Sequence, residues 1–160
     1  MISFWEKKEL LSYDLAVLGG GITGMFCALS YRERFPKARI AILERGLFSS
    51  GASTKNAGFA CFGSLSEIIE DIEQMNEKDV YEIIQMRMDG LSLLRKNLGD
   101  NILDIKFNGG YELFFDKTSK ALDKIDYINS LLKPIFSKEV FKCNNSKIKE
   151  FGFDSSKVKF

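Results

Sequence analysis

Two short apolar runs, separated by a stretch with helical spacing, dominate the beginning of the chain. The runs at residues 15–18 and 39–43 are nearly continuous, which is typical of strands buried on both faces of a sheet. Between them, apolar residues recur at helical spacing from Met25 to about Phe35, where Pro36 ends the helix. This order predicts a βαβ unit with parallel strands and a right-handed crossover.

After the second run, the pattern predicts a long loop and two helices. Residues 49–64 are rich in Gly, Ala and Ser and form a segment too long for a plain connector. Residues 65–75 place apolar side chains on one face and acidic residues elsewhere, as in an amphipathic helix. The next helix is predicted from about Asp79 to Leu98, because Gly99 is of the type that commonly ends helices.

The last third of the chain predicts antiparallel pairing and one further helix. Polar and apolar residues alternate over 103–107 and 111–115, on both sides of an Asn108-Gly109-Gly110 turn, which indicates a β-hairpin. A helix is expected over about 118–133, and Pro134 follows it. One βαβ unit cannot close a doubly wound sheet, so these elements predict an incomplete α/β fold in which an antiparallel sheet begins after the parallel unit.

Composition excludes several classes of function. The chain of 160 residues is 45% hydrophobic, which supports a globular core, and its 23 basic and 22 acidic residues give a net charge of only +1. Such a balance creates no field for nucleic acid or for an anionic membrane. Histidine is absent from the sequence. Imidazole bases, imidazole metal ligands and Ser-His-Asp triads are therefore excluded.

The cysteines and the most apolar segment also limit the possibilities. Cys27, Cys61 and Cys143 are odd in number and widely spaced, so we expect no disulfide framework, no metal site and a cytoplasmic location. Residues 15–31 are uncharged, but they contain three consecutive glycines and are shorter than a comfortable transmembrane helix. We expect no membrane span.

The sequence Gly19-Gly20-Gly21-Ile22-Thr23-Gly24 is a G-x-G-x-x-G motif at the junction of the first strand and helix. In such a motif Gly19 permits the tight turn, Gly21 lets a pyrophosphate approach the backbone, and Gly24 lets the helix pack closely on the strand. The helix N-terminus then offers free N–H groups and the positive end of its dipole to the phosphates. The motif alone is weak support for nucleotide binding.

Glu44 strengthens this interpretation because it ends the second predicted strand. A carboxylate at this place can accept hydrogen bonds from both ribose hydroxyls, and its charge disfavours a 2′-phosphate. Strand, glycine motif, helix, strand and acid agree with one another, and together they predict a Rossmann-like dinucleotide-binding unit. The spacing does not distinguish NAD from FAD, because the two share the ADP half.

The sequence also resembles a known family. The residues that carry the resemblance are Tyr13-Asp14-Leu15-Ala16-Val17-Leu18-Gly19-Gly20-Gly21, Leu43-Glu44-Arg45-Gly46, Gly51-Ala52-Ser53-Thr54-Lys55-Asn56-Ala57-Gly58 and Gly110-Tyr111-Glu112-Leu113-Phe114. They are similar to the amino-terminal part of FAD-dependent amine and amino-acid oxidoreductases, the D-amino-acid oxidase family that includes glycine oxidase and sarcosine oxidase. The resemblance implies FAD as cofactor.

The resemblance also implies roles for particular residues. The glycine motif would hold the pyrophosphate, Glu44 the adenosine ribose, and Arg45 would lie beside the adenine or ribose. The small residues of the loop would line the run from the pyrophosphate to the flavin ring. The cofactor-binding residues so implied are Gly19, Gly20, Gly21, Ile22, Thr23, Gly24, Glu44, Arg45, Ala52, Ser53, Asn56, Ala57 and Gly58.

The activity implied is hydride transfer to flavin from the C–N bond of a small amine or amino acid. We expect an FAD-binding part at 1–64, a helical connection at 65–100 and the beginning of a substrate domain at 101–160. No catalytic residue is assigned, because the family's substrate clamp comes from later in a longer chain. We therefore expect an amino-terminal fragment whose partner is the missing carboxy-terminal half or another chain. Two alternatives stay open: a flavin- or nucleotide-binding module without catalysis of its own, and an NAD-dependent reductase.

Overall fold

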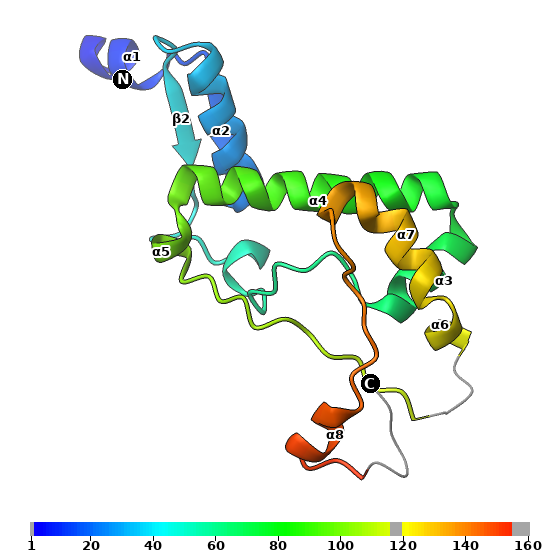
Figure 1. Cartoon of the computed structure of the whole chain (residues 1–160). Helices are drawn as coiled ribbons and strands as arrows, with labels where there is room; N and C mark the ends of the chain where they lie inside the picture. The colour runs from blue at the N-terminus through cyan, green and yellow to red at the C-terminus, as the bar shows by residue number, and fades with distance from the viewer. Residues whose placement is uncertain (1, 116–119, 155–160) are drawn as a thin grey trace. The chain divides into compact units, whose positions relative to one another are not determined.

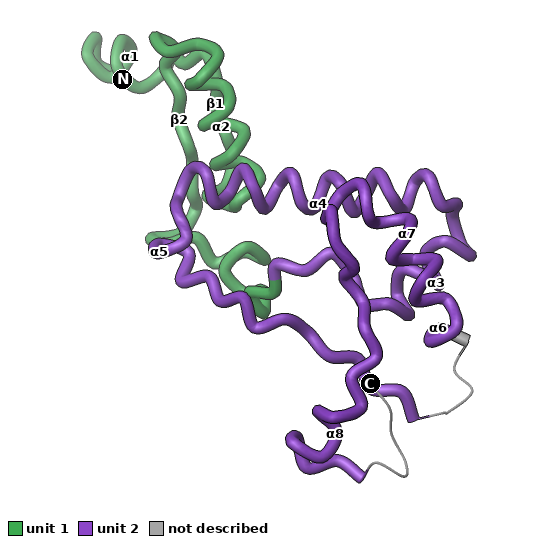
Figure 2. The backbone as a smooth tube through the Cα atoms, viewed as in Figure 1, with its two compact units in different colours: residues 1–59 green, residues 60–160 purple. Residues whose placement is uncertain are grey.

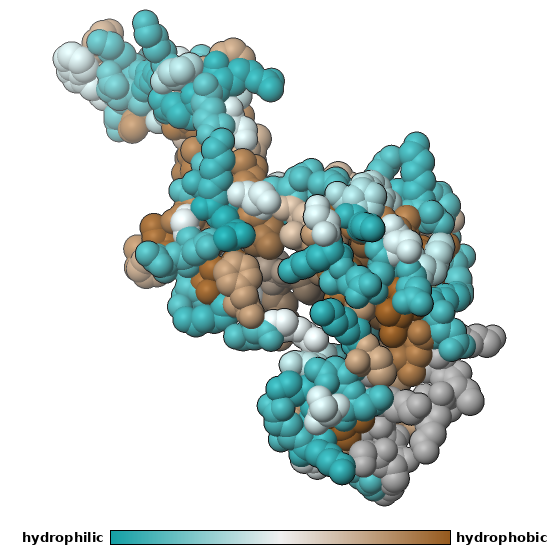
Figure 3. Space-filling view, in the orientation of Figure 1, coloured by the Kyte–Doolittle hydropathy of each residue, from teal (hydrophilic) through white to brown (hydrophobic). Residues whose placement is uncertain are grey.

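The computed structural model describes residues 2–115 and 120–154. The chain divides into two compact units, Met1–Phe59 and Ala60–Phe160 (Figure 2). Apolar side chains reach the surface in several places among polar ones (Figure 3). No helix within the described ranges combines the length and the apolar composition needed to cross a bilayer.

The first unit contains the predicted strand–helix–strand arrangement (Figure 1). The strands β1 (Leu15–Leu18) and β2 (Ile40–Leu43) pair in parallel, with Leu15 opposite Ile40 and Leu18 opposite Leu43. Helix α2 (Ile22–Arg34) connects the two strands and packs against both. The short helix α1 (Phe4–Leu10) precedes them, and a 3₁₀ turn, η1 (Ala52–Thr54), follows. Parallel pairing is thereby confirmed.

The strands are less buried than their apolar composition predicts. Val17 faces α2 and is 9% exposed, whereas Leu18 is 83% exposed and Leu43 is 56% exposed. A strand is buried on both faces only when a layer of structure covers each side of its sheet. Helix α2 supplies such a layer for the face that carries Val17. The expectation of burial on both faces was therefore wrong for Leu18 and Leu43.

The second unit is helical, and its core is formed where α3 (Leu65–Gln74), α4 (Glu77–Leu98) and α7 (Ile125–Phe136) meet. The two predicted central helices are confirmed. Ser64 caps α3 and exchanges hydrogen bonds with Glu67, and α4 ends at Gly99, whose φ of 77° suits glycine. The buried core residues are Leu65, Ile68, Ile69, Val80, Ile84, Ile128 and Leu132.

The predicted hairpin is not formed. Leu103 ends a short helix, α5 (Asp100–Leu103), and Asp104 adopts a left-handed conformation with φ 47°. Residues 105–113 have no regular secondary structure, and Phe107 and Tyr111 are exposed. An isolated hairpin is at best marginally stable in water, because its apolar face needs a further layer to cover it. The predicted antiparallel sheet was therefore wrong for the described residues.

The helix predicted after the hairpin is divided into two helices, and the second one extends beyond the predicted end. Its first two predicted positions, 118 and 119, lie outside the described residues, and the rest forms α6 (Lys120–Asp123) and α7. Pro134 lies inside α7 instead of after it. Proline removes one N–H and its ring crowds the carbonyl of residue 130, which disfavours a long continuation, and α7 ends two residues later at Phe136. A further short helix, α8 (Ser146–Glu150), follows.

Asn129 of α7 fixes the segment after this helix. Its side chain accepts hydrogen bonds from the N–H groups of Val140 and Phe141 at 3.0 and 2.9 Å, and it donates to the carbonyl of Phe141 at 2.9 Å. A buried amide side chain needs such partners, because an unpaired polar group in the interior costs free energy. This one side chain therefore replaces the pairing that a neighbouring strand would supply to residues 140 and 141.

Candidate functional site

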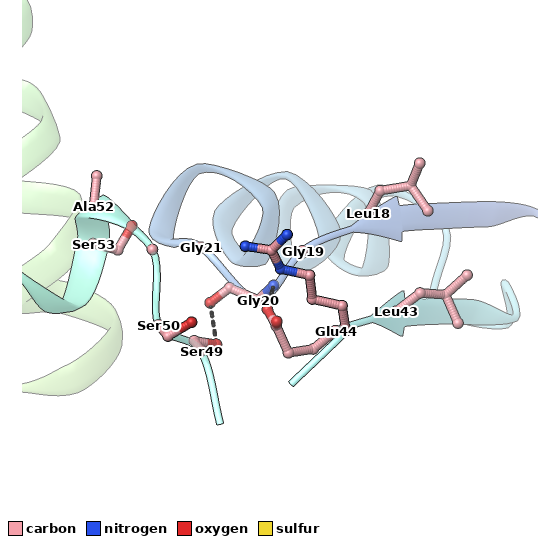
Figure 4. A pocket seen from close by; sticks show the side chains of 12 residues that line it. Leu18, Gly19, Gly20, Gly21, Leu43, Glu44, Ser49, Ser50, Ala52 and Ser53 are labelled. Atoms are coloured by element: carbon pink, nitrogen blue, oxygen red, sulfur yellow. Dashed lines mark hydrogen bonds between the residues drawn. The ribbon is translucent and has the colours of Figure 1, made fainter. Parts of the chain in front are cut away.

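A hollow of about 440 Å³ lies at the carboxyl ends of β1 and β2, within the first unit (Figure 4). Ligands of parallel α/β sheets commonly bind beyond this edge of the strands. The turn that leaves β1, the residues that follow β2 and the serine-rich loop before η1 all contribute to it. The residues that line it are Leu18, Gly19, Gly20, Gly21, Leu43, Glu44, Arg45, Ser49, Ser50, Gly51, Ala52 and Ser53.

The glycine bend is the backbone turn at Gly19, Gly20 and Gly21, between β1 and α2. Gly19 has a φ of 94°, a conformation that L side chains rarely adopt, and its N–H donates to the carbonyl of Leu43 at 2.8 Å. Gly21 is the N-cap of α2 and has extended backbone angles. The bend is therefore tied to the end of β2 as well as to β1.

Glu44 is held beside the glycine bend by two backbone N–H groups. Its Oε2 accepts a hydrogen bond from the N–H of Gly20 at 2.8 Å, and its Oε1 accepts one from the N–H of Gly46 at 3.1 Å. The Gly20 N–H, then the Gly46 N–H, hold the pKa of this carboxyl below its ordinary value of 4.5. The nearby Arg45 acts in the same direction. Glu44 therefore presents a negative charge to the hollow at neutral pH.

We expect the Glu44 carboxylate to become protonated at a lower pH than an ordinary glutamate side chain. Because the folded pKa of Glu44 is lowered, its contribution to stability is complete above the pKa of the unfolded chain and is lost as pH falls through the folded pKa. A ¹³C NMR titration of the Glu44 carboxyl carbon should give a midpoint below 4.5, with E44Q identifying the signal. A midpoint at or above 4.5 would contradict the two hydrogen bonds.

The start of α2 places backbone donors next to the bend. The first N–H groups of a helix have no partner within the helix, and the N–H of Ile22 donates instead to Oγ of Ser53 at 3.0 Å. Gly24 packs closely on β1, since a Cβ there would lie 2.6 Å from Cγ1 of Val17. Ser53 therefore brings η1 to the end of α2 at which an anion would be favoured.

The structure groups most, but not all, of the predicted cofactor-binding residues. The bend, Glu44, Arg45, Ala52 and Ser53 line the hollow, while Ile22, Thr23 and Gly24 form the first turn of α2.

The remaining three predicted residues lie after η1 and are not among the residues that line the hollow. Asn56, Ala57 and Gly58 are exposed. The Asn56 side chain donates to the carbonyl of Ser53 at 2.7 Å and accepts from the N–H of Gly58 at 2.8 Å. These contacts shape the loop, and the three residues' contact with a cofactor stays a prediction.

Ser49 is the residue that sequence reasoning missed. Its hydroxyl donates to the carbonyl of Gly20 at 2.8 Å and is partly buried (Figure 4). In the sequence it is one serine of a loop rich in small residues, and no spacing rule singles it out. Only the fold brings it to the bend.

No group of three or more His, Cys, Asp or Glu side chains arranged to hold a metal ion occurs among the described residues.

Comparison with known proteins gives one match. The model of a family described as "FAD dependent oxidoreductase" matches residues 14–140, a range that includes the hollow and much of the second unit. No curated protein and no solved structure matches the chain.

Proposed function

The chain belongs to the family of FAD-dependent oxidoreductases, whose model covers residues 14–140 of its 160 residues, and we propose that it binds the ADP half of FAD in the hollow beside Glu44. The observation that carries this proposal is the carboxylate of Glu44 held 2.8 Å from the N–H of Gly20, at the carboxyl end of β2. We further propose a substrate with a C–N bond, a small amine or amino acid.

The residues at the hollow fit a dinucleotide. An added Cβ at Gly19 or Gly51 would meet no atom within 4 Å, so the backbone there is open to a ligand. The N-terminus of α2, a helix of 13 residues, favours a diphosphate through its dipole and through the N–H groups of its first turn other than that of Ile22, which donates to Ser53. Arg45 lines the same hollow and adds a positive charge.

Glu44 also has acceptor capacity left for a ribose. An ionised carboxylate has roughly four lone-pair positions, and each of its two oxygens here accepts one backbone N–H. One further acceptor position therefore remains on each oxygen, which suits a pair of neighbouring hydroxyl donors. The negative charge of Glu44 would repel a phosphate on the same sugar. This chemistry favours an adenosine with a free 2′,3′-diol.

These contacts indicate which part of the reaction the cofactor would carry out and which part the residues of this chain would carry out. When FAD is bound, its flavin supplies a two-electron acceptor for a hydride from the carbon that bears the amine. The residues of this chain bind and orient: the bend and the first turn of α2 hold the diphosphate, and Glu44 holds the ribose. Small residues at positions 51–53 allow backbone to come close to the cofactor.

The direct test is reconstitution of the full chain with FAD. After gel filtration, the protein should retain flavin at one equivalent and show the visible absorption of bound flavin. Anaerobic addition of single amines and amino acids should bleach that absorption if the substrate proposal is correct.

Two outcomes would count against the proposal at different levels. A chain that is folded by circular dichroism and binds neither FAD nor ADP would refute the site. Retained flavin that no amine or amino acid reduces, while dithionite does, would leave the cofactor assignment standing and refute the proposed activity of this chain.

A further inference from the structure

Gly20, at the centre of the bend, is held on both sides by side chains from beyond β2. Its N–H donates to Oε2 of Glu44 at 2.8 Å, and its carbonyl accepts from Oγ of Ser49 at 2.8 Å. Gly20 itself is buried. One side chain therefore fixes each of the two peptide groups that flank the Cα of Gly20. Glu44 fixes the preceding peptide group through its N–H, and Ser49 fixes the following one through its carbonyl.

This contact determines the direction of the next donor in the bend. In a trans peptide the C=O and the N–H point in opposite directions. Since the hydroxyl of Ser49 fixes the carbonyl of Gly20, it also turns the N–H of Gly21 to the opposite side of that peptide group. The orientation of the amide that follows Gly20 thus depends on a side chain 29 residues later in the sequence.

Space, not backbone conformation, disfavours a side chain at position 20. Gly20 is not among the glycines with a positive φ. A Cβ there would lie 2.3 Å from Oγ of Ser49 and 3.3 Å from Oε2 of Glu44, but 3.6 Å from Cβ of Ser49, an ordinary contact. The middle position of a G-x-G motif is otherwise open to other residues. The obstacle at position 20 is chiefly the Ser49 hydroxyl.

We propose that Ser49 is a positioning residue that, together with Gly20, fixes Glu44 for a ribose that carries both hydroxyls. This inference rests on the proposed function, because the ribose is that of the ADP half of FAD. Ser49 lines the hollow, and its hydroxyl is engaged by the bend, so we assign it a role that acts through the bend. Its hydrogen bond fixes the carbonyl of Gly20 and so restricts rotation of the residue whose N–H donates to Glu44, which leaves less ordering to be done when the nucleotide binds.

The test is a double-mutant cycle with S49A, G20A and G20A/S49A in the full chain. Two quantities are measured: the unfolding temperature without ligand, and binding of ADP and 2′-deoxy-ADP by calorimetry. S30A serves as the matched control, because Ser30 is an exposed serine on α2 away from the hollow.

We expect S49A to weaken ADP binding about 2- to 10-fold, the scale of one lost hydrogen bond, and to reduce the preference for ADP over 2′-deoxy-ADP. G20A should lower the unfolding temperature and weaken ADP binding more than S49A does, because the added methyl displaces the Ser49 hydroxyl and crowds the Glu44 carboxylate. In G20A/S49A the clashing hydroxyl is gone, so both quantities should return toward those of S49A, a departure from additivity. S30A should match the unsubstituted chain.

Two results would overturn the inference. In the first, G20A/S49A would show neither a higher unfolding temperature nor tighter nucleotide binding than G20A. In the second, S49A would keep an unchanged preference for ADP over 2′-deoxy-ADP. If G20A does not fold, recovery of folding in G20A/S49A still tests the steric contact. Failure of the proposed function would give a different result. The unsubstituted chain would then bind neither nucleotide, but the unfolding temperature would still fall in G20A and recover in G20A/S49A.

Discussion

Replacing Gly24 by alanine is expected to destabilise the first unit by about 1–3 kcal/mol, the usual cost of forcing an extra methyl into a packed contact. A Cβ at this position would lie 2.6 Å from Cγ1 of Val17 and 3.2 Å from the carbonyl oxygen of Gly19. The second neighbour is backbone and cannot rotate away. Helix α2 would have to move from β1, and the bend between them would move with it.

Hydrogen–deuterium exchange of the amides of β1 and α2 measures this effect within the first unit. G24A/V17A should be less destabilised than the sum of G24A and V17A, because the closest atom is then absent. The matched control is G90A in α4, where an added Cβ meets nothing within 4 Å. G90A should stabilise the helix by about 0.5–1 kcal/mol when followed by circular dichroism. Equal effects of G24A and G90A would contradict the close packing of α2 on β1.

The substitution E44Q is expected to weaken ADP and FAD binding by about 10- to 100-fold, because hydrogen bonds to a charged group are stronger than neutral ones. Both oxygens of Glu44 accept a backbone N–H, from Gly20 and from Gly46. The amide of glutamine offers one oxygen and one NH₂ group, so one of these two N–H groups would face another donor. The variant therefore loses the charge and also one contact that shapes the site.

Calorimetry with ADP, and flavin fluorescence with FAD, measure the change. E33Q is the control, since Glu33 is an exposed glutamate of α2 in the same unit. It removes the same charge from the chain and should leave binding unchanged. An affinity of E44Q within twofold of the unsubstituted chain would mean that the carboxylate does not hold the ribose.

The parts of the site that sequence predicted are those encoded by neighbouring residues. The tight bend needs glycine at position 19 because of its φ of 94°, and Gly24 needs to be small because of Val17. Glu44 follows β2 directly, so the parallel register of the strands carries it to the bend. These relations repeat wherever a strand, a bend and a helix follow one another, and they can therefore be inferred from spacing.

The parts that sequence did not predict depend on contacts between distant residues. Nothing local distinguishes Ser49, which reaches Gly20, from its neighbour Ser50. Polar and apolar residues alternate over 103–107 and 111–115, as they do in strands with one buried face. The alternation does not, however, supply the layer of structure that would cover that apolar face. Phe107 and Tyr111 accordingly remain exposed. Asn129 serves the backbone of Val140 and Phe141 through bonds that no period in the sequence signals.

The parallel pairing of β1 and β2 has a consequence for proton exchange with solvent. Each strand is bonded to its neighbour along one side in the sheet that the described residues form. In a pleated strand successive N–H groups point to opposite sides, so alternate amides of residues 15–18 and 40–43 face away from the partner. Deuterium uptake along each strand should consequently alternate between slow and fast residues. A further strand docking on either edge would convert the fast set to slow exchange without altering the register of the pair.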